Sequence, residues 1–176
     1  MAPHATKAVK ATAPRTSAQK ITTSLWFDDN AEQAVQHYLS IFKNSKVLKV
    51  THYQEGGPGP KGSVMLVEFQ LAGQRFTALN GGPHFKFTEA ISLSVGCDTQ
   101  AEIDHLWAKL SEGGSPGPCG WLKDKFGLSW QIVPNRIREW MDDKDPRRSQ
   151  RVMNAVMGMG KLDIRALEAA HHSLHS

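Results

Sequence analysis

A strand–helix–strands order occurs twice along this chain, and the repeat is what most constrains the fold. The first copy predicts a strand at 21–27, a helix from 31 to about 42, and strands at 47–53, 64–71 and 76–80. The second predicts a strand at 91–95, a helix opening at Thr99 with Glu102 as a capping box, and short strands at about 121–125 and 128–133. The apolar helix positions Val35 and Leu39 recur as Ile103 and Trp107. The chain therefore reads as two copies of one structural unit.

A single helix lying on one side of each sheet cannot bury both faces of that sheet. The uncovered faces must close on each other or on a second chain. We therefore predict an α+β fold in which two βαβββ-type modules, at about 21–82 and 90–135, form a half-open sheet cleft within a domain spanning 21–136. Alternate strand residues would line the cleft.

The strand after Gly127 shows this alternation most clearly. Gly127 indicates a tight turn and Pro134 closes the strand. Along it Leu128, Trp130 and Ile132 point to one face, whereas Ser129, Gln131 and Val133 point to the other. The second face therefore carries a neutral amide, that of Gln131, at its centre.

The two ends of the chain differ from the repeat. Residues 1–20 contain four basic residues and no acidic one, and we predict a disordered basic tail. A targeting peptide, or a weak electrostatic arm for nucleic acid or a membrane, are the alternatives for this tail. Residues 137–176 predict a C-terminal helical extension, with a helix start at Asp145-Pro146 and a break at Gly158-Met159-Gly160.

Composition argues against several classes of partner. Residues 21–176 hold 17 basic and 17 acidic residues, so the net charge of +4 comes from the tail and the domain has no basic excess for nucleic acid. No apolar run approaches the roughly 20 residues that a membrane span needs. The two cysteines, Cys97 and Cys119, are too few for a disulfide framework, which predicts a cytoplasmic protein.

Three motifs carry a resemblance to a known family. They are Leu25-Trp26-Phe27 followed by Asn30-Ala31-Glu32, then Ala78-Leu79-Asn80-Gly81-Gly82-Pro83, and the run from Cys119-Gly120-Trp121 through Asp124 to Gln131. Over about residues 21–165 the chain resembles the PhnB-like branch of the vicinal oxygen chelate (glyoxalase/bleomycin resistance/dioxygenase) superfamily. Members of this branch are labelled 3-demethylubiquinone-9 3-methyltransferase-like.

The resemblance implies where a metal would bind. Metal enzymes of the superfamily take His, Glu or Gln ligands from the first, fourth, fifth and eighth strands. Here the first strand has no such residue, the fourth offers Asn80, the fifth offers Ser92 and Ser94, and the eighth has Gln131 where the family's usual Glu ligand would sit. These are neutral ligands, so we predict no metal and no cofactor. A bound metal would need His52, His84 and Glu89 from loops.

These observations predict a metal-free cleft that binds a small, partly apolar molecule in a homodimer, without nucleic acid or membrane partners. The predicted ligand-binding residues are Ser24, Trp26, Asn80, Ser92, Ser94 and Gln131. The alternative is an enzyme, either a metal-dependent glyoxalase or dioxygenase or the 3-demethylubiquinone-9 3-methyltransferase of the family label. No residue stands out as a nucleophile or general base, so catalytic residues stay unassigned. A third hypothesis is an assembly protein with a vestigial cleft.

Overall fold

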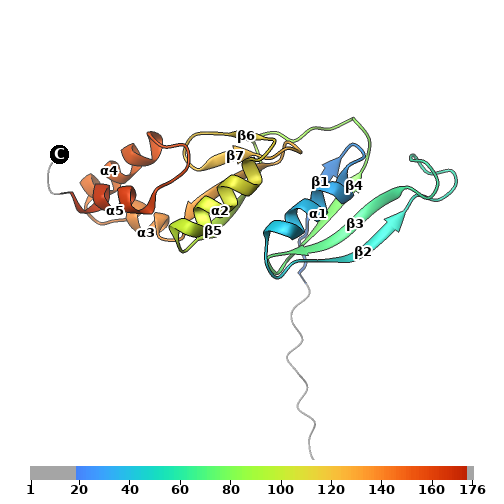
Figure 1. The fold of residues 1–176 in the computed structure, drawn as a ribbon, viewed down its shortest axis with the longest axis horizontal. Coiled ribbons are helices and arrows are strands. Elements are labelled where there is room, and N and C mark those ends of the chain that lie inside the picture. Colours follow the sequence, from blue (N-terminus) through green and yellow to red (C-terminus); the bar gives the residue numbers. More distant parts are fainter. Residues whose placement is uncertain (1–18, 174–176) are drawn as a thin grey trace, which may run out of the picture.

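The computed structural model describes residues 19–173, which form two four-stranded sheets, a helix beside each sheet, and three further helices (Figure 1). The first module contains β1 (Thr23–Phe27), α1 (Ala31–Ile41), β2 (Lys46–His52), β3 (Val64–Leu71) and β4 (Gln74–Asn80). The second contains β5 (Ser92–Cys97), α2 (Gln100–Ser111), β6 (Ser115–Pro116), β7 (Trp121–Lys123) and β8 (Ser129–Pro134). The helical extension contains α3 (Ile137–Met141), α4 (Pro146–Met157) and α5 (Ile164–His172). The predicted tail lies outside the described residues, apart from Gln19 and Lys20.

The two sheets have the same topology. Their strand orders are β1-β4-β3-β2 and β5-β8-β7-β6. In each, the first strand pairs in parallel with the fourth and the other neighbours are antiparallel. This confirms the α+β class and the repeat of one βαβββ-type module. The sequence did not predict the two-residue strand β6, because it is too short to show a period, whereas α3 lies within the stretch from 137 onward that was predicted to be helical.

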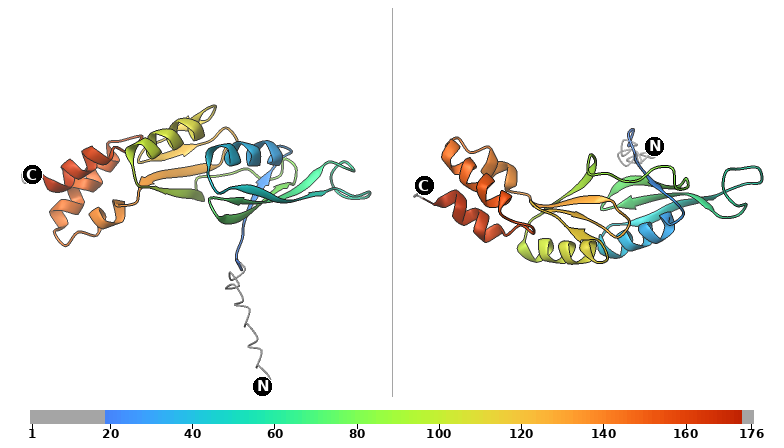
Figure 2. Two further views of the ribbon diagram at one scale, coloured as in Figure 1. Left: turned by 60° about the horizontal axis from the view of Figure 1, so that its bottom comes forward. Right: turned by 90° about the horizontal axis from the view of Figure 1, so that it is seen from above.

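Helices α1 and α2 lie on the same side of the sheets, and the opposite side of both sheets carries no helix (Figure 2). Side chains that point toward the helices are buried, and those that point to the opposite side are more exposed, as β1 shows. Leu25 and Phe27 of β1 are buried toward α1, whereas Ser24 is exposed and Trp26 is half-buried on the other face. We call the two helix-free sides the open faces of the sheets.

A buried carboxylate, that of Asp124, joins the two modules. Asp124 is only 3% exposed and accepts hydrogen bonds from the Tyr38 hydroxyl of α1 and the Trp130 indole, both at 2.8 Å. It also accepts from the backbone N–H groups of Phe126 and Leu128 at 2.8 and 3.0 Å. Burial and the neighbouring Asp124 charge raise the pKa of Tyr38 well above its usual value, so its hydroxyl stays a donor. This network fixes the turn from β7 to β8.

The two module helices are capped in different ways. Thr99 accepts a hydrogen bond from the Glu102 N–H at 3.2 Å, which confirms the predicted start of α2. Asn30 directly precedes α1, but its side chain makes no capping bond. Instead, the Asn80 amide oxygen at the end of β4 accepts from the Ala31 N–H at 2.8 Å. The cap of α1 therefore comes from a strand of the sheet rather than from the residues before the helix.

The extension has a small core of its own. Trp140, Val152, Val156, Leu162 and Leu167 are buried together, separate from the main cluster of the two modules. The predicted helix start is confirmed, because Asp145 accepts from the Arg147 N–H at 3.0 Å and Pro146 is the first helical residue. The predicted break after Met157 is also confirmed. None of the helices in residues 19–173 is long and apolar enough to cross a membrane.

Candidate functional site

On the open face of the second sheet, the structure brings together two of the six predicted ligand-binding residues. Gln131 of β8 donates from its amide nitrogen to the Ser92 hydroxyl of β5 at 2.8 Å. Both side chains are half-buried. The predicted alternation of β8 is correct, since Leu128, Trp130 and Ile132 are buried on the helix side while Gln131 and Val133 are half-buried. Ser94 is exposed on the same face, opposite Gln131.

Ser24, Trp26 and Asn80 all belong to the first module. Ser24 accepts from the Thr77 hydroxyl at 3.0 Å. The Trp26 indole donates to the Gly82 carbonyl at 2.9 Å, and its ring meets that of Phe85 edge-on with 4.8 Å between centroids. Asn80 caps α1 and also donates to the Val64 carbonyl at 3.0 Å. The amide of Asn80 thus has structural partners on both of its ends.

Three cavities of the described part of the chain each hold a different subset of the six residues. Trp26 lines a cavity of about 290 Å³ with Phe85 and Phe126. Asn80 lines another of about 640 Å³ beside Asp28. Ser92 and Ser94 line a third of about 290 Å³, between β5 and the end of α1. The six residues therefore divide between the two sheets, and their contact with a ligand stays a prediction.

The residues of the open faces do not fit a metal ion. Within residues 19–173, no three His, Cys, Asp or Glu side chains lie close enough together to hold one. His52, His84 and Glu89 are not brought together as a group of three, and Glu89 pairs instead with Lys123 at 2.5 Å. Gln131 directs its amide nitrogen, a hydrogen-bond donor, at Ser92. A divalent ion prefers charged carboxylates or imidazoles to such a set.

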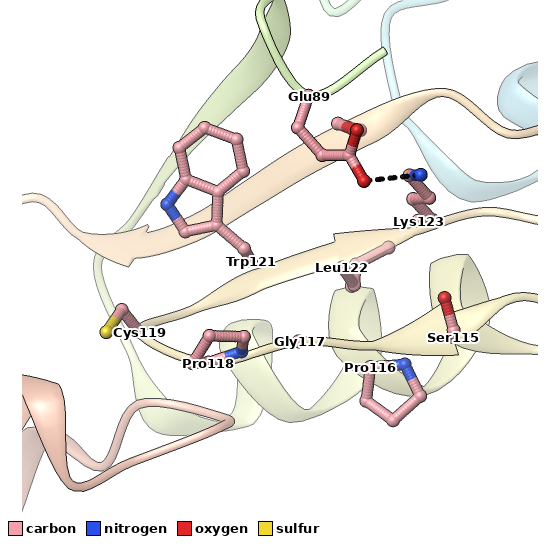
Figure 3. A pocket seen from close by; sticks show the side chains of 10 residues that line it. Glu89, Ser115, Pro116, Gly117, Pro118, Cys119, Trp121, Leu122 and Lys123 are labelled. Atoms are coloured by element: carbon pink, nitrogen blue, oxygen red, sulfur yellow. Dashed lines mark ion pairs between the residues drawn. The ribbon is translucent and has the colours of Figure 1, made fainter. Parts of the chain in front are cut away.

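A cavity that the sequence did not single out lies on the second sheet (Figure 3). It has a volume of about 400 Å³, and mostly apolar atoms line it. Glu89, from the segment joining the modules, reaches Lys123 of β7 across it, and Trp121 stands beside them. The loop from Gly117 to Cys119 lies on the other side of the cavity.

The strand alternation contained a signal for this cavity. Lys123 lies opposite Ser129 and Trp121 lies opposite Gln131, so the four residues share the open face. Ser129 is only 1% exposed, and its hydroxyl has no hydrogen-bond partner among the described residues. The hydrogen bond from Lys123 holds the pKa of Glu89 below its usual value.

The two cysteines are expected to differ in reactivity. Cys97 is buried, and burial raises its pKa to about 12, whereas Cys119 is half-buried in the wall of the cavity. The thiolate is the reactive form. With a disulfide reagent at pH 8, one thiol per folded chain should react rapidly and a second only after denaturation. Mass spectrometry of the labelled peptide should place the first label on Cys119, and rapid labelling of Cys97 would contradict this assignment.

Comparisons with known proteins agree with this fold. The sequence model of the family described as 3-demethylubiquinone-9 3-methyltransferase matches residues 19–133. A putative 3-demethylubiquinone-9 3-methyltransferase, PhnB protein, from Bacillus cereus is 39% identical, with a TM-score of 0.59 over 65% of this chain and 99% of that one. None of the curated proteins compared with the chain matches it.

More distant structures show the fold alone. A protein from Pseudomonas aeruginosa is 20% identical, with a TM-score of 0.55 over 66% of this chain and 98% of that one. The fosfomycin resistance protein FosX from Listeria monocytogenes is 14% identical, with a TM-score of 0.50 over 70% of this chain and 96% of that one. The family match covers the two modules and stops before the helical extension. The chain belongs to the PhnB-like, 3-demethylubiquinone-9 3-methyltransferase-like family of the vicinal oxygen chelate superfamily.

Proposed function

We propose that this chain is a PhnB-like binding protein whose open sheet faces form a metal-free cleft for a small, partly apolar molecule. The observation that carries the proposal is the bond from the Gln131 amide to the Ser92 hydroxyl at 2.8 Å. It puts two neutral polar groups at the place where the family resemblance implies a metal ligand. Neutral amides and hydroxyls orient an organic ligand by hydrogen bonds, and apolar walls supply contact area.

Aromatic side chains flank the polar groups on both sheets. Trp26 and Trp121 are each half-buried, one on each open face. A half-buried indole offers a flat apolar surface together with an N–H donor. This combination supports a ligand with a partly apolar body.

Metal analysis of the purified protein tests the proposal. After dialysis against metal-free buffer, we expect zinc, nickel, manganese and iron each at well below one ion per chain. The reason is that no three carboxylates, imidazoles or thiolates converge within residues 19–173, and the groups that meet on the second open face are an amide and a hydroxyl. One firmly held ion per chain would contradict the proposal and favour an enzyme of the glyoxalase or dioxygenase type.

We further propose that a second copy of the chain closes the cleft. The open faces carry no helix, and two large apolar side chains of the segment joining the modules, Phe85 and Ile91, are 66% and 71% exposed. Exposed apolar surface of this kind is typical of a subunit contact.

Sedimentation velocity should therefore give a mass twice that of the chain at micromolar concentration. Ile91→Glu should shift the protein toward the monomer, because a charge would be buried in the contact. Glu55→Lys is the control, because it alters the charge of another exposed side chain, in the loop between β2 and β3, and it should leave the mass unchanged. A wild-type protein that stays monomeric at every concentration would contradict a dimeric cleft.

A further inference from the structure

Three hydrogen-bond donors stand in one row across the open face of the second sheet. Ser92 of β5 lies opposite Ser129 of β8, and Ser129 lies opposite Lys123 of β7. Neighbouring strands lie about 4.8 Å apart, so the row spans roughly 10 Å. Ser92 already accepts from Gln131, which leaves its hydroxyl proton to donate. The row therefore presents two hydroxyls and an ammonium group to the same side of the sheet.

The middle member of this row lacks a partner. The Ser129 hydroxyl is buried and makes no hydrogen bond within residues 19–173, and Ser129 is one of the residues that line the cavity of about 400 Å³. Leaving a buried hydroxyl unpaired is costly, and a folded protein seldom keeps one without a reason. A ligand oxygen in the cavity would supply the missing acceptor.

The charged member of the row has a partner that a ligand can replace. The Glu89 side chain is 64% exposed and the Lys123 side chain is 37% exposed, so solvent weakens their ion pair. Glu89 belongs to the segment between the modules rather than to the sheet, whereas Lys123 is held by β7. The carboxylate of a ligand would therefore replace Glu89 as the ion-pair partner of Lys123, and the Glu89 side chain would move into solvent.

We propose that this cavity binds a small organic acid, whose carboxylate contacts Lys123 and Ser129 and whose apolar body lies against Trp121. The proposal rests on the binding function proposed above and names the class of ligand. The row supplies donors, which suit an oxyanion. The walls supply the Trp121 ring and Pro118, which suit an aromatic or aliphatic chain. The carboxylate of the ligand replaces that of Glu89, so Lys123 keeps one negatively charged partner.

The test compares acids with their neutral amides on the full chain. The probes are benzoate, phenylacetate and 3-phenylpropionate, each beside the primary amide of the same acid, titrated by protein-observed NMR at constant ionic strength. An acid and its amide have nearly the same shape, so their difference reports the charge. At least one acid should bind about tenfold more tightly than its amide, the effect expected of one charge-assisted hydrogen bond.

Three variants assign that difference to residues. Lys123→Met should abolish the preference for the acid and change amide affinity less than about threefold. Glu89→Gln should raise acid affinity about threefold, because it removes the competing carboxylate. Ser129→Ala should weaken acid and amide alike by about fivefold while the unfolding midpoint holds or rises, since it deletes an unpaired hydroxyl. Lys125→Met, next to the same strand but outside the cavity, is the control and should behave as wild type.

The possible failures are distinct. Equal affinity for acid and amide in the wild type would overturn the organic-acid proposal and leave the proposed binding function standing. A preference for acids that survives Lys123→Met would place the anion elsewhere and overturn this site. If none of the acids and amides binds at millimolar concentration, the organic-acid proposal is wrong. A thermal-shift screen of unrelated small molecules then tests the proposed binding function separately: a compound that raises the unfolding temperature would support it, and a screen without any such compound would contradict it.

Discussion

Replacing Asp124 by alanine should lower the free energy of unfolding by about 4 kcal/mol, because several buried donors would lose their acceptor. The Tyr38 hydroxyl, the Trp130 indole and the N–H groups of Phe126 and Leu128 all bond to this one carboxylate. The bond from Tyr38 also ties α1 of the first module to the β7–β8 turn of the second. Urea unfolding followed by circular dichroism and tryptophan fluorescence measures the loss.

Asp104→Ala is the matched control for this prediction. Asp104 is exposed on α2, where it accepts from Lys161 and Gln100. Because solvent can replace those bonds, its loss should cost less than about 1 kcal/mol. If the two aspartate variants were equally stable, the buried carboxylate would not be the central element of the module contact.

Trp140→Ala should destabilise the helical extension while the two modules stay folded. Trp140 is fully buried in the small core of α3, α4 and α5, and removing a large buried aromatic side chain typically costs about 3–5 kcal/mol. A loss of this size is larger than the free energy of unfolding expected for so small a core. Hydrogen exchange should therefore speed up in α3–α5 and stay unchanged in the central strands β3 and β8.

Met157→Ala is the control, because Met157 lies on α4 but is 65% exposed and should change stability by less than about 0.5 kcal/mol. Faster exchange in both sheets of the Trp140 variant would mean that the extension and the modules unfold as one unit. The result matters for the family, since the Bacillus cereus relative is matched over 99% of its length by only 65% of this chain.

Much of the fold could be predicted from the sequence because periodicity is a local property. The alternation of β8 and the Thr99 cap of α2 each depend on residues a few positions apart, and the structure confirms both. The Glu102 carboxylate, however, accepts from the Asp98 N–H rather than from that of Thr99. The site was less predictable. Gln131 and Ser92 were expected on the cleft face and do meet, but Asn80 turned out to cap α1. No local pattern favours Asn80 over Asn30 as the cap, because that role depends on where β4 ends in space.

Local residue patterns were enough to predict the two modules, the alternation of strand faces and the balanced charge of the domain. Which polar groups have partners could be known only from the packed structure. Tyr38 and Asp124 are separated by 86 positions in the chain yet bond at 2.8 Å, whereas Ser129 is buried without a partner among the described residues. The physical reason is that strand and helix patterns follow from neighbouring residues, while a buried hydrogen bond depends on distant segments packing side by side.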